Sequence, residues 1–387
     1  MAAPVPPTRH SSRRPSPAVL KRRRILAAVI ALLAVGLVVV LVVTVVHALS
    51  GPGGTADPKP QTSGGATPAP TPESPVEALL ATTDDPNACA VSFEGDGIAI
   101  DPMLQTQGVL YTGLPIPARE GLVFAGWYAT AEDAAAYTPT ARINGSELAA
   151  CTDRRLTLHG SWMTPEQNAE AATEVPILMY HQFTTRPEGE DNALRGNYAY
   201  IGDFEAHMAY IAEQQFYLPT WDELNAFIDG TVYLPPKSVI ITDDDADQTW
   251  LDLAVPVVTQ HQLLTTSFVI TEYRTEGSPS PYVIQRSHTH DMHEAGDNGE
   301  GRMVNWSADQ IAADLEQSAA ILGAKEVVAY PFGHYNDTTK QGVAQAGFLL
   351  GRTIEWGYVT PGTDKLALPV IRINYGDTLE SLISDIG

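Results

Sequence analysis

Two groups of side chains in the second half of the chain could do chemistry. Residues 243–247 read Asp-Asp-Asp-Ala-Asp directly after an apolar run, and residues 288–293 hold three histidines within six positions. Adjacent carboxylates repel one another and raise one another's pKa, so a bound cation would relieve the cost of placing them together. Carboxylates and imidazoles are ligands for divalent metals such as zinc. Together the two groups predict a metal site. Taken singly, an acidic turn and a solvated histidine-rich loop are the alternatives.

The segments around these groups alternate between short apolar runs and helical patterns. Residues 175–180, 238–241 and 327–330 are typical of buried strands. Residues 203–215 place apolar side chains on one helical face, and Ser307 is in position to cap a helix that runs to Leu322. Strands alternating with helices predict an α/β fold whose chemistry lies at the carboxyl ends of the strands. The acidic run directly follows such a strand.

The acidic run resembles the first motif of the NodB-homology polysaccharide deacetylases, also called carbohydrate esterase family 4. That motif usually reads Thr-Phe-Asp-Asp-Gly, and the ungapped alignment sets its threonine on Thr242 and its aspartate pair on Asp244 and Asp245. Asp243 stands where the family usually has an apolar residue. A shift of one position, which would make Asp243 and Asp244 the pair, therefore stays open.

Three further segments carry the same resemblance, which covers about residues 175–382. His288-Thr289 followed by His293 is similar to the second motif as it occurs in the poly-N-acetylglucosamine deacetylases of biofilms. Residues 329–333, Ala-Tyr-Pro-Phe-Gly, resemble the third motif, and residues 175–181 resemble an early strand of the same branch. The resemblance implies a distorted (β/α) barrel of the NodB-homology type over residues 175–387.

The resemblance also implies a role for each residue. Asp245, His288 and His293 would hold a divalent metal ion, for which zinc is the first candidate. Three protein ligands would leave an open position at which the ion polarises a carbonyl and lowers the pKa of water. Asp244 would be the general base, and the backbone N–H of Phe332 would help to stabilise the oxyanion of the tetrahedral intermediate.

The general acid is less directly indicated. The late Leu-x-His motif of the family is absent, because residues 368–372 read Leu-Pro-Val-Ile-Arg. In the similar branch the early histidine serves as the acid, so His181 is expected to protonate the leaving amine, with His334 as its rival. Many relatives place an arginine at the position of Ala329 to orient the base. Arg372 is expected to take that role here, with an ordinary surface arginine as the alternative.

One departure from the family lies between a strand expected to end near Thr271 and the histidine motif that begins at His288. A full helix is expected there, yet residues 272–282 are short and rich in Ser, Pro and Gly. This predicts a changed barrel wall or substrate groove beside an otherwise complete set of catalytic residues.

Residues 88–164 predict a small β-rich module. Short alternating runs at 91–93, 109–111 and 156–159 are typical of strands separated by turns. The chain's two cysteines, Cys89 and Cys151, lie here, and a disulfide between them is expected outside the cytoplasm, with two buried thiols as the alternative.

Part of this module resembles the Listeria–Bacteroides-type repeat of bacterial surface proteins. The resemblance rests on residues 121–128, Gly-Leu-Val-Phe-Ala-Gly-Trp-Tyr, and on residues 156–162. It implies a wall-associated spacer or binding module. Trp127, Tyr128 and Trp162 are expected to be core aromatics, and a carbohydrate platform is the alternative.

The N-terminal residues predict a membrane anchor. Residues 1–24 carry seven basic and no acidic side chains, and residues 25–46 contain no charge, which is long enough to span a bilayer. An uncleaved anchor is favoured over a cleaved signal peptide, because residues 46–50 are a poor cleavage site. The basic tail is then cytoplasmic and the catalytic domain extracellular. Residues 47–87, rich in Gly, Pro and Thr, are expected to be a linker.

The charge of the body excludes one class of partner. The net charge is −23 and the basic tail contributes +7, which leaves −30 for the rest of the chain. Nucleic acid is therefore not expected as a partner. The resemblance to the polysaccharide deacetylases implies N-deacetylation of an acetylated polysaccharide, either peptidoglycan or poly-N-acetylglucosamine. O-deacetylation of xylan-type sugars, an inactive wall-binding protein and a structural protein that stores metal are the alternatives.

Overall fold

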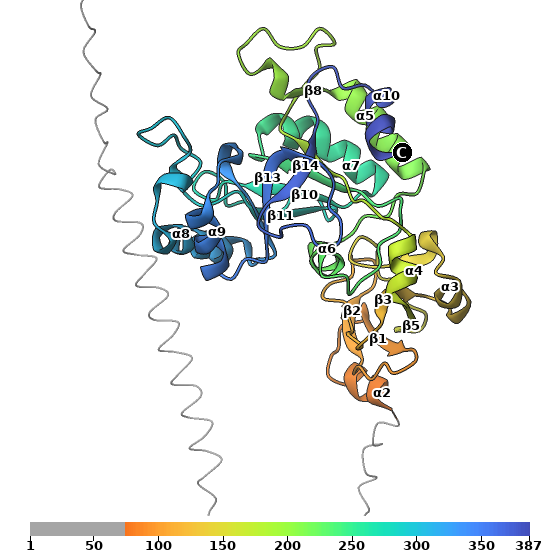
Figure 1. Cartoon of the computed structure of the whole chain (residues 1–387). Helices are drawn as coiled ribbons and strands as arrows, with labels where there is room; N and C mark the ends of the chain where they lie inside the picture. The colour runs from red at the N-terminus through yellow and green to blue at the C-terminus, as the bar shows by residue number, and fades with distance from the viewer. Residues whose placement is uncertain (1–73) are drawn as a thin grey trace, which may run out of the picture. The chain divides into compact units, whose positions relative to one another are not determined.

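Seven parallel strands close into a barrel in the C-terminal part of the chain (Figure 1). The computed structural model describes residues 74–387. Around the barrel the order is β10-β11-β12-β13-β14-β6-β9, and each neighbouring pair is parallel. The predicted (β/α) barrel is confirmed. Its strands are β6 (Ile177–Tyr180), β9 (Ile240–Asp244), β10 (Thr265–Val269), β11 (Val283–Ser287), β12 (Val327–Ala329), β13 (Leu350–Trp356) and β14 (Leu368–Arg372).

Helices connect and cover most of these strands. The predicted amphipathic helix is α5, and its buried face includes Phe204, Met208 and Ile211. The predicted cap of α8 is present, because the Ser307 hydroxyl accepts the N–H of Gln310 in a capping box. The barrel helices are α5 (Ile201–Glu213), α6 (Trp221–Ile228), a π-helical turn (Trp250–Ala254) leading into α7 (Val255–His261), α8 (Ala308–Leu322), α9 (Asp337–Gln345) and α10 (Leu379–Ile386).

Shorter elements complete the barrel region. Between β10 and β11 the chain makes turns and no helix, as residues 272–282 predicted. Outside the barrel, β7 pairs with β8 in a two-stranded parallel sheet. These minor elements are β7 (Gln182–Thr184), β8 (Tyr198–Tyr200) and the 3-10 turns at Arg195–Asn197, Arg302–Asn305 and Pro331–Gly333.

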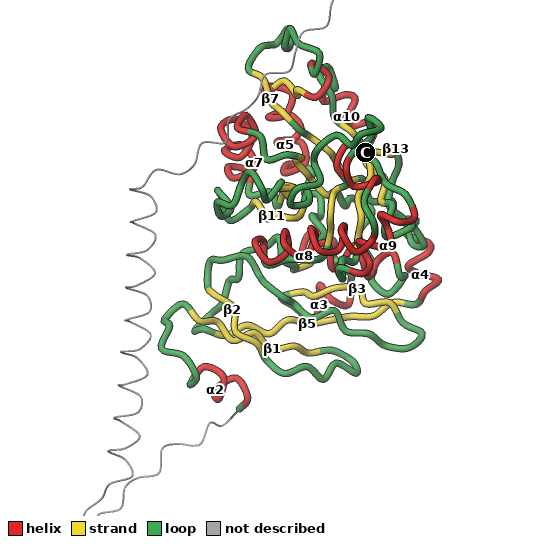
Figure 2. Tube along the Cα trace, turned by 90° about the vertical axis from the view of Figure 1, so that its left-hand side faces the viewer, coloured by secondary structure: helices red, strands yellow, loops and turns green. Residues whose placement is uncertain are grey.

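A five-stranded sheet precedes the barrel in the order β2-β1-β5-β3-β4 (Figure 2). Trp127 and Tyr128 are buried in its core, as expected for core aromatics. Residues 109–111 were expected to form a strand, but they make only an isolated bridge from Leu110 to Leu148. Gly108 and Gly113, both with positive φ, turn the chain on either side of this run. The elements are α2 (Pro75–Leu80), β1 (Ala88–Glu94), β2 (Met103–Thr106), β3 (Val123–Tyr128), α3 (Ala131–Ala136), a 3-10 turn (Pro139–Ala141), β4 (Arg142–Ile143), β5 (Arg155–Met163) and α4 (Pro165–Glu170).

Two predictions for this region, the disulfide and the linker, can be compared with the structure. Cys89 and Cys151 form a disulfide with their Cα atoms 6.1 Å apart. The linker predicted at 47–87 is wrong at its end, because α2 occupies residues 75–80. Ser74 caps this helix and Pro75 stands at its first position, where the missing N–H costs nothing. The rest of the linker lies outside the described residues.

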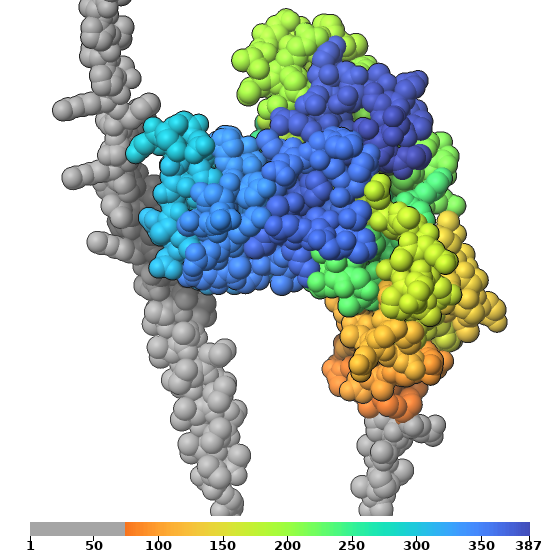
Figure 3. All heavy atoms as spheres, in the orientation of Figure 1, coloured from red at the N-terminus to blue at the C-terminus, as the bar shows by residue number. Residues whose placement is uncertain are grey.

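The sheet and the barrel share one hydrophobic core. Cys89, Val91 and Trp127 of the sheet pack in the same cluster as Met179 and Leu350 of the barrel strands. A buried ion pair between Arg142 on β4 and Glu223 on α6 also crosses the junction at 3.0 Å. The space-filling view shows the atoms of the two regions in direct contact (Figure 3). The module predicted as a separate unit therefore packs against the barrel as part of one body.

The predicted tail and anchor, residues 1–24 and 25–46, lie outside the described residues. Within residues 74–387, no helix is both long and apolar enough to cross a bilayer.

Candidate active site

The acidic run lies at the carboxyl end of β9, where the chain leaves the barrel. Asp243 and Asp244 are the last residues of the strand, and Asp245 begins the loop that follows. Successive side chains of a strand point to opposite faces. Asp244 accordingly points into the barrel, while the Asp243 carboxylate accepts a 3.4 Å hydrogen bond from Ser267 on the neighbouring strand. The three aspartates therefore occupy three different environments.

Asp245 meets the two predicted histidine ligands. Its Oδ1 lies 3.4 Å from Nε2 of His288 and 3.3 Å from Nε2 of His293. Ligands about 2.1 Å from a tetrahedral ion stand about 3.4 Å apart, so these separations fit a metal such as zinc. Within the described residues the buried Asp245 Oδ1 has no hydrogen-bond partner, which suits an atom that binds a metal ion. The donor set therefore fits a divalent metal ion.

The histidine tautomer also suits metal binding. His288 Nδ1 lies 3.0 Å from the carbonyl oxygen of Ala329. A carbonyl only accepts, so Nδ1 carries the proton and donates it, which leaves the lone pair of Nε2 directed toward Asp245. The neighbouring imidazoles also matter for Asp245. Burial raises the pKa of its carboxyl, but when no metal is bound the hydrogen bond and charge of a protonated His288, with the charge of His293, outweigh this and hold the pKa below its usual range.

His290, the third histidine of the loop, is not part of the candidate metal site formed by Asp245, His288 and His293. Its Nδ1 lies 3.0 Å from the Thr271 hydroxyl, and its Nε2 lies 2.8 Å from the Gln317 side-chain amide. Both ring nitrogens are therefore engaged away from Asp245. The density of histidines in the sequence could not distinguish this structural residue from the two ligands.

Asp244 is fully enclosed and paired with Arg352. The guanidinium of Arg352, on β13, binds Asp244 Oδ1 inside the barrel, and both side chains are buried. Burial alone would raise the pKa of Asp244, but the charge of Arg352, followed by that of His181, lowers it. Asp244 is therefore held as a carboxylate, the form that a general base requires.

Arg352 corrects the prediction made for Arg372. Arg372 does not contact Asp244; its guanidinium donates to Asn197 Oδ1 at 2.7 Å and to Asn374 Oδ1 at 3.1 Å. Asp244, the candidate base, is instead paired with an arginine of β13. A signal was present in the sequence, since Arg352 is a charged residue within the strand-like run Leu-Gly-Arg-Thr.

His181 lies on the other side of Asp244 from Arg352. Its Nε2 is 3.6 Å from Asp244 Oδ2, and its buried Nδ1 has no hydrogen-bond partner in residues 74–387. Burial lowers the pKa of His181 below its ordinary value, although the charges of Asp244 and Asp245 oppose that shift. The rival acid, His334, instead accepts the N–H of Gly301 through Nδ1 at 2.8 Å.

These groups surround a cavity of about 350 Å³ at the carboxyl ends of the strands. His334 is not among its lining residues, whereas Arg372 is. Phe332 also borders the cavity, and the centroid of its ring lies 4.4 Å from the centroid of the His293 ring. The lining residues are His181, Gln182, Leu194, Asn197, Asp244, Asp245, His288, His293, Tyr330, Phe332, Gly333, Ile354 and Arg372.

The backbone around the cavity is unusual in one respect. Asp245, Ala246, Thr289 and Phe332 all have positive φ, between 50° and 73°. Non-glycine residues rarely adopt this conformation, and such residues concentrate at functional sites because the surrounding contacts must hold them there. The loops after β9, β11 and β12 are therefore fixed by packing around the same cavity.

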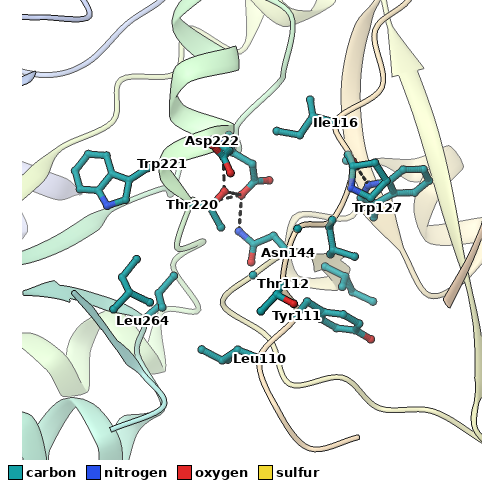
Figure 4. A pocket seen from close by; sticks show the side chains of 18 of the residues that line it. Leu110, Tyr111, Thr112, Ile116, Trp127, Asn144, Thr220, Trp221, Asp222 and Leu264 are labelled. Atoms are coloured by element: carbon teal, nitrogen blue, oxygen red, sulfur yellow. Dashed lines mark hydrogen bonds between the residues drawn. The ribbon is translucent and has the colours of Figure 1, made fainter. Parts of the chain in front are cut away.

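A second, larger pocket of about 440 Å³ lies at the junction of the sheet and the barrel (Figure 4). Its barrel walls come from α6 and from residues before or early in β10, β11 and β12. These are the amino ends of the strands, opposite the metal ligands. The pocket is lined mostly by apolar side chains, among them Ile116, Trp127 and Trp221, and includes no residue predicted for the active site.

Comparisons with known proteins agree with the location of the site. A family model described as polysaccharide deacetylase matches residues 231–351, which include the acidic run, the histidine loop and Phe332. The poly-beta-1,6-N-acetyl-D-glucosamine N-deacetylase of Staphylococcus aureus (strain MRSA252) is 29% identical over 170 residues, covering 38% of this chain and 58% of that protein. Its counterpart from Staphylococcus epidermidis is 28% identical over 174 residues, covering 39% of this chain and 59% of that protein. The chain thus spans somewhat over half the length of these relatives.

Among solved structures, the deacetylase PplD of Streptococcus pyogenes in complex with acetate covers 56% of this chain and 99% of its own. Its sequence identity to this chain is 25%, and the TM-score is 0.47.

Proposed function

We propose that this chain is a metal-dependent enzyme that removes N-acetyl groups from an N-acetylglucosamine-containing polysaccharide. The observation that carries the proposal is the grouping of Asp245, His288 and His293 at 3.3–3.4 Å beside the arginine-paired carboxylate of Asp244. The family match over residues 231–351 and the named relatives support the same chemistry. A metal-storing structural protein would not require a buried, arginine-paired carboxylate next to its ligands.

Asp245, His288 and His293 would hold the metal, and zinc suits their one carboxylate and two imidazoles. When bound, the ion would polarise the acetamide carbonyl and lower the pKa of water. Asp244, held ionised by Arg352, accepts the proton of the attacking water. The backbone N–H of Phe332 would donate to the oxyanion of the tetrahedral intermediate. The left-handed conformation of Phe332 directs this part of the loop along the cavity.

His181 would supply the proton that the leaving amine needs. It borders the cavity and lies beside Asp244, whereas His334 is engaged with Gly301 and does not border the cavity. Arg372 and Asn197, which are hydrogen-bonded to one another, also line the cavity and would help to bind the sugar.

The test is a product balance with the purified full-length chain and β-1,6-linked N-acetylglucosamine oligomers. N-deacetylation releases one acetate for each primary amine formed. We expect both products in equal amounts, their loss in the presence of a chelator, and recovery when zinc is added back. Acetate without amine, from O-acetylated sugars only, would show an esterase instead. A metal-loaded, folded protein that releases acetate from no acetylated glycan would be inactive in the proposed sense.

We further propose that the enzyme acts outside the cell, held by a single-pass anchor at residues 25–46 with the N-terminal tail in the cytoplasm. The uncharged run at 25–46 and the basic tail support this. The Gly-x-x-Phe-x-Gly-Trp-Tyr motif at 121–128 supports a surface-repeat origin for the β-rich module. Protease added to intact cells should remove the catalytic domain and leave the tail protected. A protected catalytic domain would place the enzyme inside.

A further inference from the structure

The loop that carries both histidine ligand candidates contains a strained residue. His288 follows the last residue of β11, and His293 comes five residues later. Between them Thr289 has φ +69°, which is a strained conformation for a β-branched side chain. Contacts from outside the loop must therefore keep the two imidazoles at the separation that the metal site needs.

Asp314 of α8 makes two of these contacts, in addition to the hydrogen bonds that the N–H groups of Thr271 and Glu272 donate to the carbonyls of Thr289 and His290. Its Oδ1 accepts the backbone N–H of His290 at 2.7 Å, and its Oδ2 accepts that of Asp291 at 2.8 Å. Successive backbone N–H groups after a left-handed residue form a concavity that binds anions, and hydrogen bonds to a carboxylate are stronger than those between neutral groups. The Asp314 side chain occupies this concavity as a fixed anion, and the residue is only 7% exposed.

Other residues of α8 contact the same loop, but each makes a single neutral contact. Gln317 donates to the His290 ring at 2.8 Å, and the Ser318 hydroxyl lies 2.8 Å from that of Ser287. Ser287 in turn accepts the N–H of the strained Thr289 at 3.0 Å. Asp314 is the group on this helix that binds two consecutive amides of the segment between the ligands.

We propose that Asp314 is a positioning residue that sets the spacing of His288 and His293 before a metal binds. This inference rests on the proposed metal site. Asp314 touches neither substrate nor ligand, and it acts by fixing the backbone between the two ligands. Its removal should therefore weaken metal binding far more than it slows turnover once the metal is bound.

The variant to test is Asp314→Asn, which keeps the size of the side chain but replaces one acceptor with a donor that faces an N–H. Glu316→Gln is the matched control, because Glu316 is exposed on the same helix.

Zinc affinity of the full-length chain is measured by competition with a chelating dye. Loss of a group that orients metal ligands typically weakens metal affinity by about 10–100-fold. We expect that loss in Asp314→Asn, no change in Glu316→Gln, and turnover within a few-fold of wild type at saturating zinc. Equal zinc affinity in all three proteins would overturn the proposal.

A second measurement does not depend on the folding of any variant. Hydrogen exchange in the metal-free wild-type chain should show protected amides at His290 and Asp291, because both are bound to Asp314 without any metal. Rapid exchange at both positions would contradict a loop that is set in advance. Wild-type protein that binds no zinc in the dye titration would instead refute the proposed metal function, whatever the exchange result.

Discussion

The two ends of the barrel hold two cavities of different character. The junction pocket at the amino ends of the strands is the larger, at about 440 Å³, and its walls are mostly apolar. The cavity at the carboxyl ends is smaller, at about 350 Å³, but it brings together two carboxylates, three imidazoles and a guanidinium. Non-glycine residues with positive φ border the second cavity at Asp245 and Phe332. The end with polar side chains and strained backbone is therefore the candidate reactive end, although its cavity has the smaller volume.

The largest expected effect is a loss of turnover when Asp244 or a metal ligand at the carboxyl end of the barrel is replaced. Zinc content distinguishes the two kinds of residue. Asp244→Asn removes the general base but keeps an oxygen to accept from Arg352, so turnover should fall by about 10²–10⁴-fold while zinc stays bound. His288→Ala should lose both zinc and turnover. Acetate release and zinc content of the same preparations measure the two effects. If Asp244→Asn lost its zinc, the assignment of Asp245 as the ligand would be wrong.

The next effect depends on the substrate. An amine leaves poorly unless it is protonated, so His181→Ala should cost about 10²–10⁴-fold on N-acetyl glycans. An activated acetate ester has a better leaving group and should lose less. Parallel rates on both substrates, with zinc content as the control, test this. Equal losses would mean that His181 positions water or sugar, and a selective amide defect in His334→Ala would move the acid there.

A smaller effect is expected at Asp243, which belongs to the same acidic run but lies outside the cavity. Burial, followed by repulsion from Asp244 and Asp245, raises the pKa of Asp243 well above its ordinary value. The folded state thus binds this proton more tightly than the unfolded state. The resulting stability is present below the unfolded pKa of about 3.9 and is lost as the pH rises through the folded pKa.

Asp243→Asn should therefore be more stable than wild type at pH 7, by about 1 kcal/mol or more, because the wild-type carboxyl must either stay ionised in a buried place beside two carboxylates or take up a proton on folding, and asparagine does neither. The gain should shrink toward pH 4. Urea unfolding at both pH values measures it. Zinc binding and turnover should change little. A dead Asp243→Asn variant would instead favour the shifted alignment in which Asp243 and Asp244 form the motif pair.

The smallest effect on activity is expected at the amino end. Ile116→Ala enlarges the junction pocket and removes a partly buried side chain that packs on the shared core. It should lower the free energy of unfolding by about 1–2 kcal/mol, less than for a fully buried isoleucine. Turnover should stay within about twofold, and Ile116→Leu is the volume-matched control. A large loss of acetate release at unchanged stability would show that the two ends of the barrel are coupled.

The sequence predicted the strands and ligands that follow local patterns. The apolar runs became β6, β9 and β12, Ser307 capped α8, and the motif residues Asp245, His288 and His293 met in space. The strands could be predicted because strand periodicity determines them. The three ligand candidates came from the family resemblance; their side chains lie together, and their binding of a metal stays a prediction. The disulfide also agreed with the expected pairing.

The choice of arginine could not be made in the same way. Both Arg352 and Arg372 lie on strands. Which one reaches Asp244 depends on its height along the barrel axis and on whether its side chain points into the barrel. Arg352 lies at the height of Asp244, beside Met179 and over the Phe268 ring. Arg372 lies at the end of β14. Residue spacing along the chain carries no information about contacts across the barrel interior.

The core shared by the sheet and the barrel has a consequence for how the protein is made. Its contributors run from Cys89 to Val370, so most of the chain must be synthesised before that core can close. Chains emerge from the ribosome at about 5–20 residues per second, and the sheet appears first. For tens of seconds or less, Val91 and Trp127 therefore lack the barrel residues that pack against them in the folded protein. A catalytic fragment produced without the sheet would have an uncovered apolar face where the shared core is now closed.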